Sequence, residues 1–217
     1  MSVLEEYFSI KWPKLFGIIL ILYFFSLWLS QSLVNEIVYY NTYSEQLTYD
    51  RAMELYGILK SNSWIAYLSF PIILLIKIST ISLILYIGVI FVGLQNQISL
   101  GKMFRVVTAS EIAFVLAVLI KILWFSYFAG NYTINDISFF YPASLLNLFS
   151  EHEVDRLWIM PLQTVNLFHL SYILLLIYGV KVVGKVNSIR SEKIVAGTYL
   201  PFLLIWIVFI MFLTVKP

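Results

Sequence analysis

Apolar side chains gather into five long runs that are separated by stretches richer in polar and charged residues. The runs cover about residues 15–34, 70–93, 106–128, 160–182 and 194–214. Each is close to the roughly 20 residues that a helix needs to cross the hydrocarbon core of a bilayer. Because lipid offers no hydrogen-bond partners to the backbone, such runs are expected to be helical. The pattern predicts an all-α integral membrane protein whose single transmembrane domain is a five-helix bundle.

Composition supports this class and excludes others. Hydrophobic residues make up 61% of the chain and charged residues 12%, against about 45–50% and about 25% in soluble domains. A net charge of +2 gives no electrostatic reason to expect a nucleic-acid partner. The chain has no cysteine and only two histidines, which excludes disulfides and thiolate chemistry and leaves little for a metal site. No nucleophile and base pair is apparent, so we expect no catalytic site and no cofactor.

The charges of the connecting segments predict the orientation of the bundle. The links at about 94–105 and 183–193 are short and basic, whereas the segments 35–69 and 129–159 are longer and mainly acidic. Short basic loops remain in the cytoplasm. Five crossings then place the N-terminus inside and Lys216 outside. Tryptophans at the ends of the runs fit an aromatic belt at each interface.

Short helices are expected outside the spans. Ser2 with Glu5, and Thr42 with Glu45, have the spacing of a capping box, and Pro142 suits the first position of a helical turn. The first box predicts an interfacial lead-in. The other two signals predict short amphipathic helices in the outer loops, with these apolar positions: Leu47, Met53, Tyr56, Leu59, Leu145, Leu146, Leu148 and Phe149.

An internal repeat exceeds what apolar composition alone would give. Residues 83–85 align with 174–176 at an offset of 91, and two glycines, an asparagine and a lysine recur in the same register. The matched pairs are Gly88 and Gly179, Val89 and Val180, Val92 and Val183, Gly93 and Gly184, Asn96 and Asn187, Ile98 and Ile189, and Lys102 and Lys193.

The repeated glycines suggest structural roles. Gly93 and Gly184 fall where helices should end, so each is expected to be a left-handed cap. Gly88 and Gly179 lie inside helices, where a missing side chain permits close helix packing. The second and third helices, and the fourth and fifth, are therefore predicted to form two parallel-repeat hairpins about an axis along the membrane normal.

Three ionisable residues fall inside the predicted spans: Lys77, Glu111 and Lys121. Intramembrane charges are candidates for function. All three lie within about 10 Å of a span end, and a lysine stem can reach much of that distance. The sequence therefore favours edge charges that reach the headgroups over an ion pathway.

The fourth run carries a polar row of Gln163, Asn166 and His169. Three-residue steps keep these side chains loosely on one helix face. Hydrogen bonding to another helix is the favoured interpretation, and a substrate or proton site is the alternative. The outer segment 151–155 holds Glu151, His152, Glu153 and Asp155, which is more typical of a solvated loop than of a metal site because no second histidine is near.

From about Gly93 onward the chain resembles the Yip family of Ypt/Rab-interacting membrane proteins, in its bacterial branch. The residues that carry the resemblance are Ile98-Ser99-Leu100-Gly101-Lys102-Met103-Phe104-Arg105-Val106-Val107, Tyr141-Pro142-Ala143-Ser144-Leu145-Leu146-Asn147-Leu148, Leu167-Phe168-His169-Leu170 and Tyr178-Gly179-Val180-Lys181. The resemblance implies five helices with a cytosolic N-terminus. Eukaryotic members act in vesicle trafficking through Rab-type GTPases, but the segment before the first run is too short here for a GTPase-binding region.

These observations favour a non-enzymatic accessory or scaffold subunit in a bacterial inner membrane. Its expected partners are membrane lipids and either other integral membrane proteins or further copies of itself. The alternative is a small transporter or ion-conducting protein that uses Glu111, Lys121, Lys77 and the polar row of the fourth span.

Overall fold

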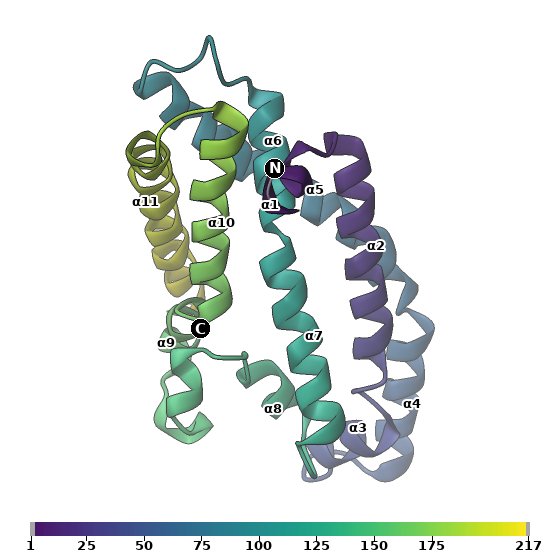
Figure 1. Cartoon of the computed structure of the whole chain (residues 1–217). Helices are drawn as coiled ribbons and strands as arrows, with labels where there is room; N and C mark the ends of the chain where they lie inside the picture. Colours follow the sequence, from purple (N-terminus) through teal and green to yellow (C-terminus); the bar gives the residue numbers. More distant parts are fainter. Residues whose placement is uncertain (1–2, 216–217) are drawn as a thin grey trace.

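The computed structural model describes residues 3–215, and all of its long elements are helices (Figure 1). Five helical spans are long and apolar enough to cross a membrane. They are α2 (Trp12–Gln31), α5 (Trp64–Phe91), α6 (Leu100–Ser110) continued by α7 (Ile112–Tyr127), α10 (Leu167–Gly184) and α11 (Ser188–Val215). No strand occurs between residues 3 and 215. The predicted all-α, five-helix membrane bundle is confirmed, and the chain is a multi-pass membrane protein.

Short helices occupy both ends of the bundle. At one end lies α1 (Val3–Ser9). At the other lie α3 (Glu36–Tyr43), α4 (Tyr49–Ser61), α8 (Ile134–Phe139), η1 (Leu145–Leu148), η2 (Glu151–Glu153) and α9 (Arg156–Thr164). We call the first the basic end, because lysine and arginine predominate in the two links between spans, residues 94–105 and 183–193. We call the second the acidic end, because aspartate and glutamate predominate in its loops and short helices.

The fourth span begins later than the sequence predicts. Its helix α10 starts at Leu167 rather than near residue 160, because Asn166 ends the preceding helix and caps the next one. The Asn166 side chain accepts a hydrogen bond from the backbone N–H of His169 at 2.7 Å, and Asn166 also forms an isolated bridge with Ser144. The residues from 156 to 164 form the separate helix α9.

The predicted caps at the acidic end are wrong in detail. Thr42 does not start a helix but lies inside α3, where its hydroxyl donates to the Val38 carbonyl and accepts from the Ile134 N–H. Asn35 caps α3 and Thr48 precedes α4. Ser144, not Pro142, precedes the short turn η1. The proposed pairing of Ser2 with Glu5 lies outside the described residues, although the helix that follows, α1, is present.

Four of the spans form a ring. Helix α5 contacts α6 and α11, and α10 likewise contacts α6 and α11. The pairs α5–α6 and α10–α11 are the two predicted hairpins, while the contacts α6–α10 and α11–α5 join them into the ring. Helix α2 packs outside this ring, along α6 and α7. Exchanging the two hairpins therefore reproduces the same set of helix contacts.

The two glycines inside the spans lie at matching crossings of this ring. A Cβ atom at Gly88 would lie 3.1 Å from Ile194 Cγ2, and one at Gly179 would lie 2.7 Å from Val106 Cγ1. Gly88 is thus packed on α11 as Gly179 is packed on α6. The two contacts are equivalent if Val106 corresponds to Ile194, which is an offset of 88 residues.

This comparison corrects the register of the repeat. The offset of 91 fits α5 and α10, where Leu85 and Leu176 are both fully buried. It fails in the following helices, because Ile98 is fully buried whereas Ile189 is 62% exposed. An offset of 88 fits them instead, since the turn between α10 and α11 is shorter than the turn between α5 and α6.

The two turns also end their helices differently. Gly93 has a φ of 73°, so a glycine takes the left-handed position after α5. After α10 that position belongs to Lys185, with a φ of 52°, and not to Gly184 as the repeat predicts. Gly184 is packed instead against Ile98, whose Cδ1 would lie 2.5 Å from an added Cβ. Asn96 lies in a turn, whereas Asn187 caps α11 by accepting from the Arg190 N–H.

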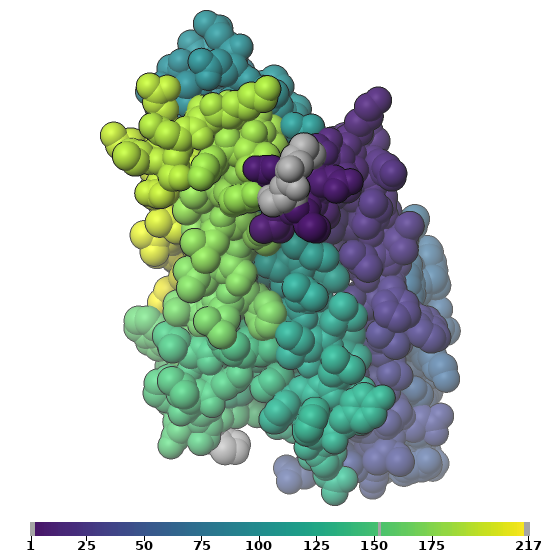
Figure 2. All heavy atoms as spheres, in the orientation of Figure 1, coloured from purple at the N-terminus to yellow at the C-terminus, as the bar shows by residue number. Residues whose placement is uncertain are grey.

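Helix α1 closes the basic end of the bundle. Phe8 is fully buried and lies beside the backbone of Gly179. The Tyr7 hydroxyl donates to the Ala109 carbonyl at 3.0 Å, and the Trp12 indole N–H donates to the Thr108 hydroxyl. Burial raises the pKa of Tyr7 to about 12. Figure 2 shows this segment lying against the neighbouring spans.

Candidate functional site

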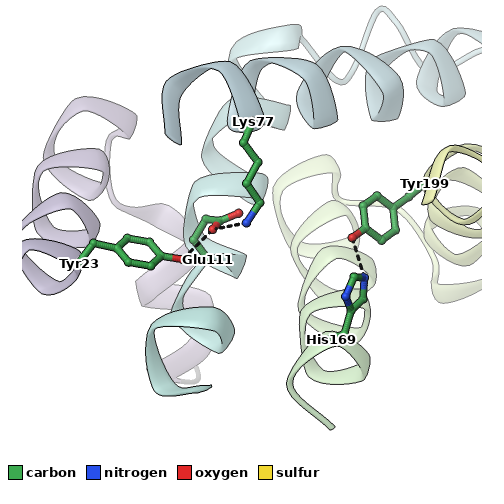
Figure 3. A network of polar contacts seen from close by, with 5 residues as sticks. All are labelled: Tyr23, Lys77, Glu111, His169 and Tyr199. Atoms are coloured by element: carbon green, nitrogen blue, oxygen red, sulfur yellow. Dashed lines mark hydrogen bonds and ion pairs between the residues drawn. The ribbon is translucent and has the colours of Figure 1, made fainter. Parts of the chain in front are cut away.

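Two charges that the sequence places inside the spans meet in the middle of the bundle (Figure 3). Lys77 Nζ donates to Glu111 Oε2 at 2.8 Å and forms an ion pair with it. The Glu111 side chain is 0% exposed, whereas that of Lys77 is 39% exposed. In place of the expected reach toward the headgroups, Lys77 turns inward and its charge is neutralised by a carboxylate on another span.

The position of Glu111 follows from a break in its helix. It is the single residue between α6 and α7, and its N–H is shared between the carbonyls of Val107 and Thr108. The following N–H groups of Phe114 and Val115 both donate to the Glu111 carbonyl. The span therefore continues across the break, and the carboxylate is placed between α2, α5 and α10.

Aromatic rings surround the ion pair. Lys77 Nζ lies 4.1 Å from the centre of the Phe114 ring and 5.8 Å from that of Tyr172. Tyr23 of α2 donates its hydroxyl to Glu111 Oε2 at 3.0 Å. An ammonium beside aromatic faces forms a cation–π interaction, and this attraction is strongest where water is excluded.

Two polar atoms beside the pair have no hydrogen-bond partner among the described residues. They are Glu111 Oε1 and the Tyr172 hydroxyl oxygen, both buried. The Tyr172 hydroxyl is close enough to Glu111 for the two groups to interact electrostatically. Buried polar atoms are usually paired. These two atoms lie within reach of each other, so the Tyr172 hydroxyl is a further group beside the Glu111 carboxylate.

A second polar pair lies across the ring of helices. His169 Nε2 and the Tyr199 hydroxyl are 2.9 Å apart, joining α10 to α11 (Figure 3). With the offset of 88, Tyr199 is the counterpart of Glu111. Each hairpin therefore places a polar group from its second helix against one from its first. Ring contacts among Phe114, His169, Tyr172 and Tyr199 connect the two pairs.

The predicted polar row does not lie on one helix face. Gln163 belongs to α9, Asn166 caps α10, and only His169 lies within the span. The Gln163 amide donates to the carbonyls of Ser138 and Phe139, so it fastens α9 to α8. Only His169 of this row is near the central site.

Lys121 also lies apart from the central pair. It is on α7, partly buried, and makes no ion pair or hydrogen bond among residues 3–215. Between the same residues no group of three or more acidic, histidine or cysteine side chains could hold a metal ion. The acidic segment 151–155 includes the turn η2, in which Ser150 lowers the pKa of Glu153 through a backbone hydrogen bond.

The tyrosines of the site could not be selected from the sequence. Tyr23, Tyr172 and Tyr199 are three of 15 tyrosines, and nothing in their spacing separates them from interfacial ones. Tyr141, in the loop after α8, also interacts with Glu111. Burial, and then the charge of Glu111, raise its pKa to about 12. The electrostatic influence of Glu111 therefore extends to a hydroxyl outside the spans, at the acidic end.

Two grooves open near the acidic end, and Glu111 lines neither. One of about 580 Å³ lies between α2, α4 and the start of α5, and includes Leu27, Asn62 and Tyr67. The other, of about 780 Å³, lies between α7 and the loop after it, and includes Trp124, Asp136 and Phe140. Neither groove reaches the carboxylate, whose side chain is fully buried.

No family model, no curated protein and no solved structure matches this chain.

Proposed function

We propose that the chain is a non-enzymatic accessory or scaffold subunit, of the Yip type and in a bacterial inner membrane, that binds other membrane proteins. The observation that carries this proposal is the uncovered second half of α11. From Pro201 to Thr214 no residue is buried, although the first half of the same helix contributes Ile194, Val195 and Tyr199 to the core. Although α11 also contacts α9, the exposed face of this segment can pack against a helix of another protein.

Five of the most exposed residues of this segment form one continuous strip. Positions 204, 205, 208, 209 and 212 repeat at steps of one and three residues and so share a helix face. Their exposed fractions are between 49% and 68%. The strip contains Leu204, Ile205, Val208, Phe209 and Phe212. Apolar side chains of different sizes suit packing against a second helix, which in lipid depends on close fit.

The turns at the basic end support a partner within the membrane. The connections between α5 and α6 and between α10 and α11 are short, so they offer no folded domain for a soluble partner. At this end the surface that remains for protein contacts is therefore mainly the membrane-facing part of the helices.

Co-purification tests this proposal. The wild-type chain, Leu204→Ala/Phe209→Ala and the control Ile72→Ala/Ile73→Ala, which changes exposed apolar residues of α5, would be extracted in mild detergent and analysed by native mass spectrometry. We expect an integral membrane protein to accompany the wild-type chain and the control, but not the α11 variant. A lone monomer in all three samples would contradict the proposal. Loss of a second copy of this chain in the α11 variant would identify the partner as itself.

A small transporter or ion-conducting protein is the second candidate. It is favoured by the two polar pairs, in which Glu111 and Tyr199 occupy equivalent positions of the repeated hairpins, since substrate sites of repeat transporters lie near the midplane between repeats. The enclosed position of Glu111 argues for the accessory role instead. Reconstitution into liposomes would decide, because an ion flux that is present in the wild type and lost in Glu111→Gln would support transport.

A further inference from the structure

The groove between α7 and the loop after it, which we call the α7 groove, changes in character along its length. On the span it is lined by Ile120 and Trp124 of α7, which are 43% and 45% exposed. Ile120 lies about 10 Å along the helix axis before the end of α7. Elsewhere the groove is lined by polar residues of the acidic end: Asn131, Asp136, Asn147 and Glu151. The groove therefore leads from the apolar part of a span to the acidic end.

Aromatic rings form a wall of the α7 groove. Trp124 and Phe140 stack with ring centres 5.6 Å apart and ring planes 11° apart, and Phe140 meets Phe125 edge to face. Phe125 in turn lies 5.0 Å from the ring of Tyr132, whose hydroxyl donates to the Leu33 carbonyl. Because these contacts tie α7 to the following loop and to the end of α2, the fold itself holds this wall in place.

Two further rings line the α7 groove without being used in the wall. Phe139 is half-buried and Phe149 is 46% exposed. Neither ring contacts another aromatic ring between residues 3 and 215. The face of an aromatic ring attracts a cation, most of all an organic ammonium. Phe139 and Phe149 can therefore contact a positively charged group in the groove.

Two carboxylates make one end of the α7 groove negative. Asp136 Oδ2 accepts from the Thr133 N–H at 2.8 Å and from the Thr133 hydroxyl at 2.7 Å, so this carboxylate is held at the start of α8. Glu151 makes no hydrogen bond or ion pair in the described part of the chain. No lysine or arginine is among the described residues that line the groove. The negative charge of the groove is therefore uncompensated and favours a cationic ligand.

These features together match an amphiphile with a hydrocarbon chain and an ammonium group. The part of the groove on the span suits a chain, and aromatic faces combined with carboxylates suit an ammonium. Asn131 adds an exposed amide donor for a phosphate oxygen. The volume of about 780 Å³ is in the range of about 300–1,000 Å³ that is usual for ligand sites. The second groove, between α2, α4 and α5, is lined by no charged residue in the described chain, so it lacks this complementarity.

From these observations we propose that the α7 groove binds a membrane phospholipid whose headgroup carries an ammonium. A lipid chain lies along Ile120 and Trp124, on the span. The ammonium lies at the carboxylates of Asp136 and Glu151, at the acidic end. The site therefore selects lipids by headgroup and disfavours those whose headgroup is only anionic. This inference does not depend on the proposed accessory role.

Lipid binding measured by native mass spectrometry tests the proposal. The purified, delipidated full chain would be titrated with phosphatidylethanolamine and, separately, with phosphatidylglycerol of the same chains, which carries a glycerol in place of the ammonium. We expect the wild type to bind phosphatidylethanolamine about five- to ten-fold more tightly. The preference should disappear in Asp136→Asn/Glu151→Gln, in which the amide oxygens keep the hydrogen-bond acceptors and so the cap of α8.

Glu45→Gln/Asp50→Asn is the matched control. It removes two exposed carboxylates of the same acidic end that line neither groove. This variant should keep the lipid preference of the wild type, because the charges at the α7 groove are unchanged.

Three results would overturn the proposal. Equal binding of the two lipids by the wild type would mean that the groove does not distinguish headgroups. Loss of the preference in the control variant would assign it to the overall charge of the acidic end. Displacement of the bound lipid by ethanolamine at an equal concentration would show that the chain is not needed and that a free amine is the ligand.

If the double variant does not fold, Glu151→Gln alone keeps the test sharp, since this side chain has no hydrogen bond in the described chain. It should lower the preference about two- to three-fold, and an unchanged preference would contradict the proposal. Co-purification of a partner protein is a separate readout, so its loss would not bear on lipid binding.

Discussion

Glu111 and Lys77 depend on each other to different degrees, because only one of them can reach a polar surface. The carboxylate is enclosed, whereas the lysine is partly exposed and its long stem can carry the charge elsewhere. Removing one member of a buried pair leaves the other charge uncompensated, at a cost of about 3–5 kcal/mol. The structure therefore predicts an asymmetry between the two single substitutions.

Lys77→Met should reduce the free energy of unfolding by about 3 kcal/mol or more, and Glu111→Gln should reduce it by less. The double variant should be more stable than the sum of the two losses implies, because it contains no unpaired charge. Unfolding in mild detergent measures all three. Lys121→Met is the matched control, since this lysine has no ion pair in the described part of the chain. Simple additivity would show that the pair contributes nothing as a pair.

Tyr141 gives a pH-dependent prediction. Burial and the Glu111 charge raise its pKa from 10.0 to about 12 in the folded chain. A group whose folded pKa is raised contributes stability below its unfolded pKa and loses it as pH rises through the folded value. Stability should therefore fall between about pH 10 and 12, and less steeply in Tyr141→Phe. Tyr127→Phe, at an exposed residue, should follow the wild type. Identical slopes in all three chains would contradict the raised pKa of Tyr141.

At the scale of helices, the glycines where neighbouring helices of the bundle cross lead to a separate prediction. Gly179→Ala would place a Cβ 2.5 Å from Phe8 Cε1 and 2.7 Å from Val106 Cγ1. Overpacking of this kind costs about 1–3 kcal/mol, and the easiest relief is displacement of α1. We expect lower thermal stability and faster tryptic cleavage at Lys11, which follows that helix.

Gly197→Ala is the control for that substitution, because no atom lies within 4 Å of a Cβ built at this position in α11. It should leave stability unchanged or raise it slightly, since alanine restricts the unfolded chain more than glycine does. Equal losses in both variants would mean that general glycine effects, and not contact with Phe8, determine the result.

The elements also show how far the sequence could lead. The five spans follow from the lengths of the apolar runs, because lipid imposes helix and length together. The break at Asn166 lies inside a continuous apolar run, so run length alone does not reveal it, although the cap itself is local and formed by Asn166 with the His169 N–H. The contact of Lys77 with Glu111 was also out of reach, because depth along a helix does not reveal which helices are neighbours. The shorter second turn likewise moved the register from 91 to 88 and could be recognised only from the packing of Gly88 and Gly179.

For the molecule as a whole, the separation of charge between the two ends is the main consequence of the fold. Both short turns and α1 lie at the basic end, and the short helices from α3 to α9 lie at the acidic end. Basic segments are retained in the cytoplasm. The predicted orientation therefore places the basic end and the acidic end on opposite sides of the membrane, and each end can be labelled separately.

The absence of cysteine makes that measurement direct. Asn96 lies in the turn at the basic end and Asn131 in a loop at the acidic end, and both are exposed. Asn96→Cys and Asn131→Cys therefore provide two chains that differ only in where a single thiol is placed. In intact cells a membrane-impermeant maleimide should label the Asn131→Cys chain and should label the Asn96→Cys chain only after lysis. The reverse pattern would invert the bundle, and labelling of both thiols in intact cells would mean that the two ends do not lie on opposite sides of a membrane. Since five spans separate the chain ends, the same result also determines that residues near α1 and the last turn of α11 lie in different compartments.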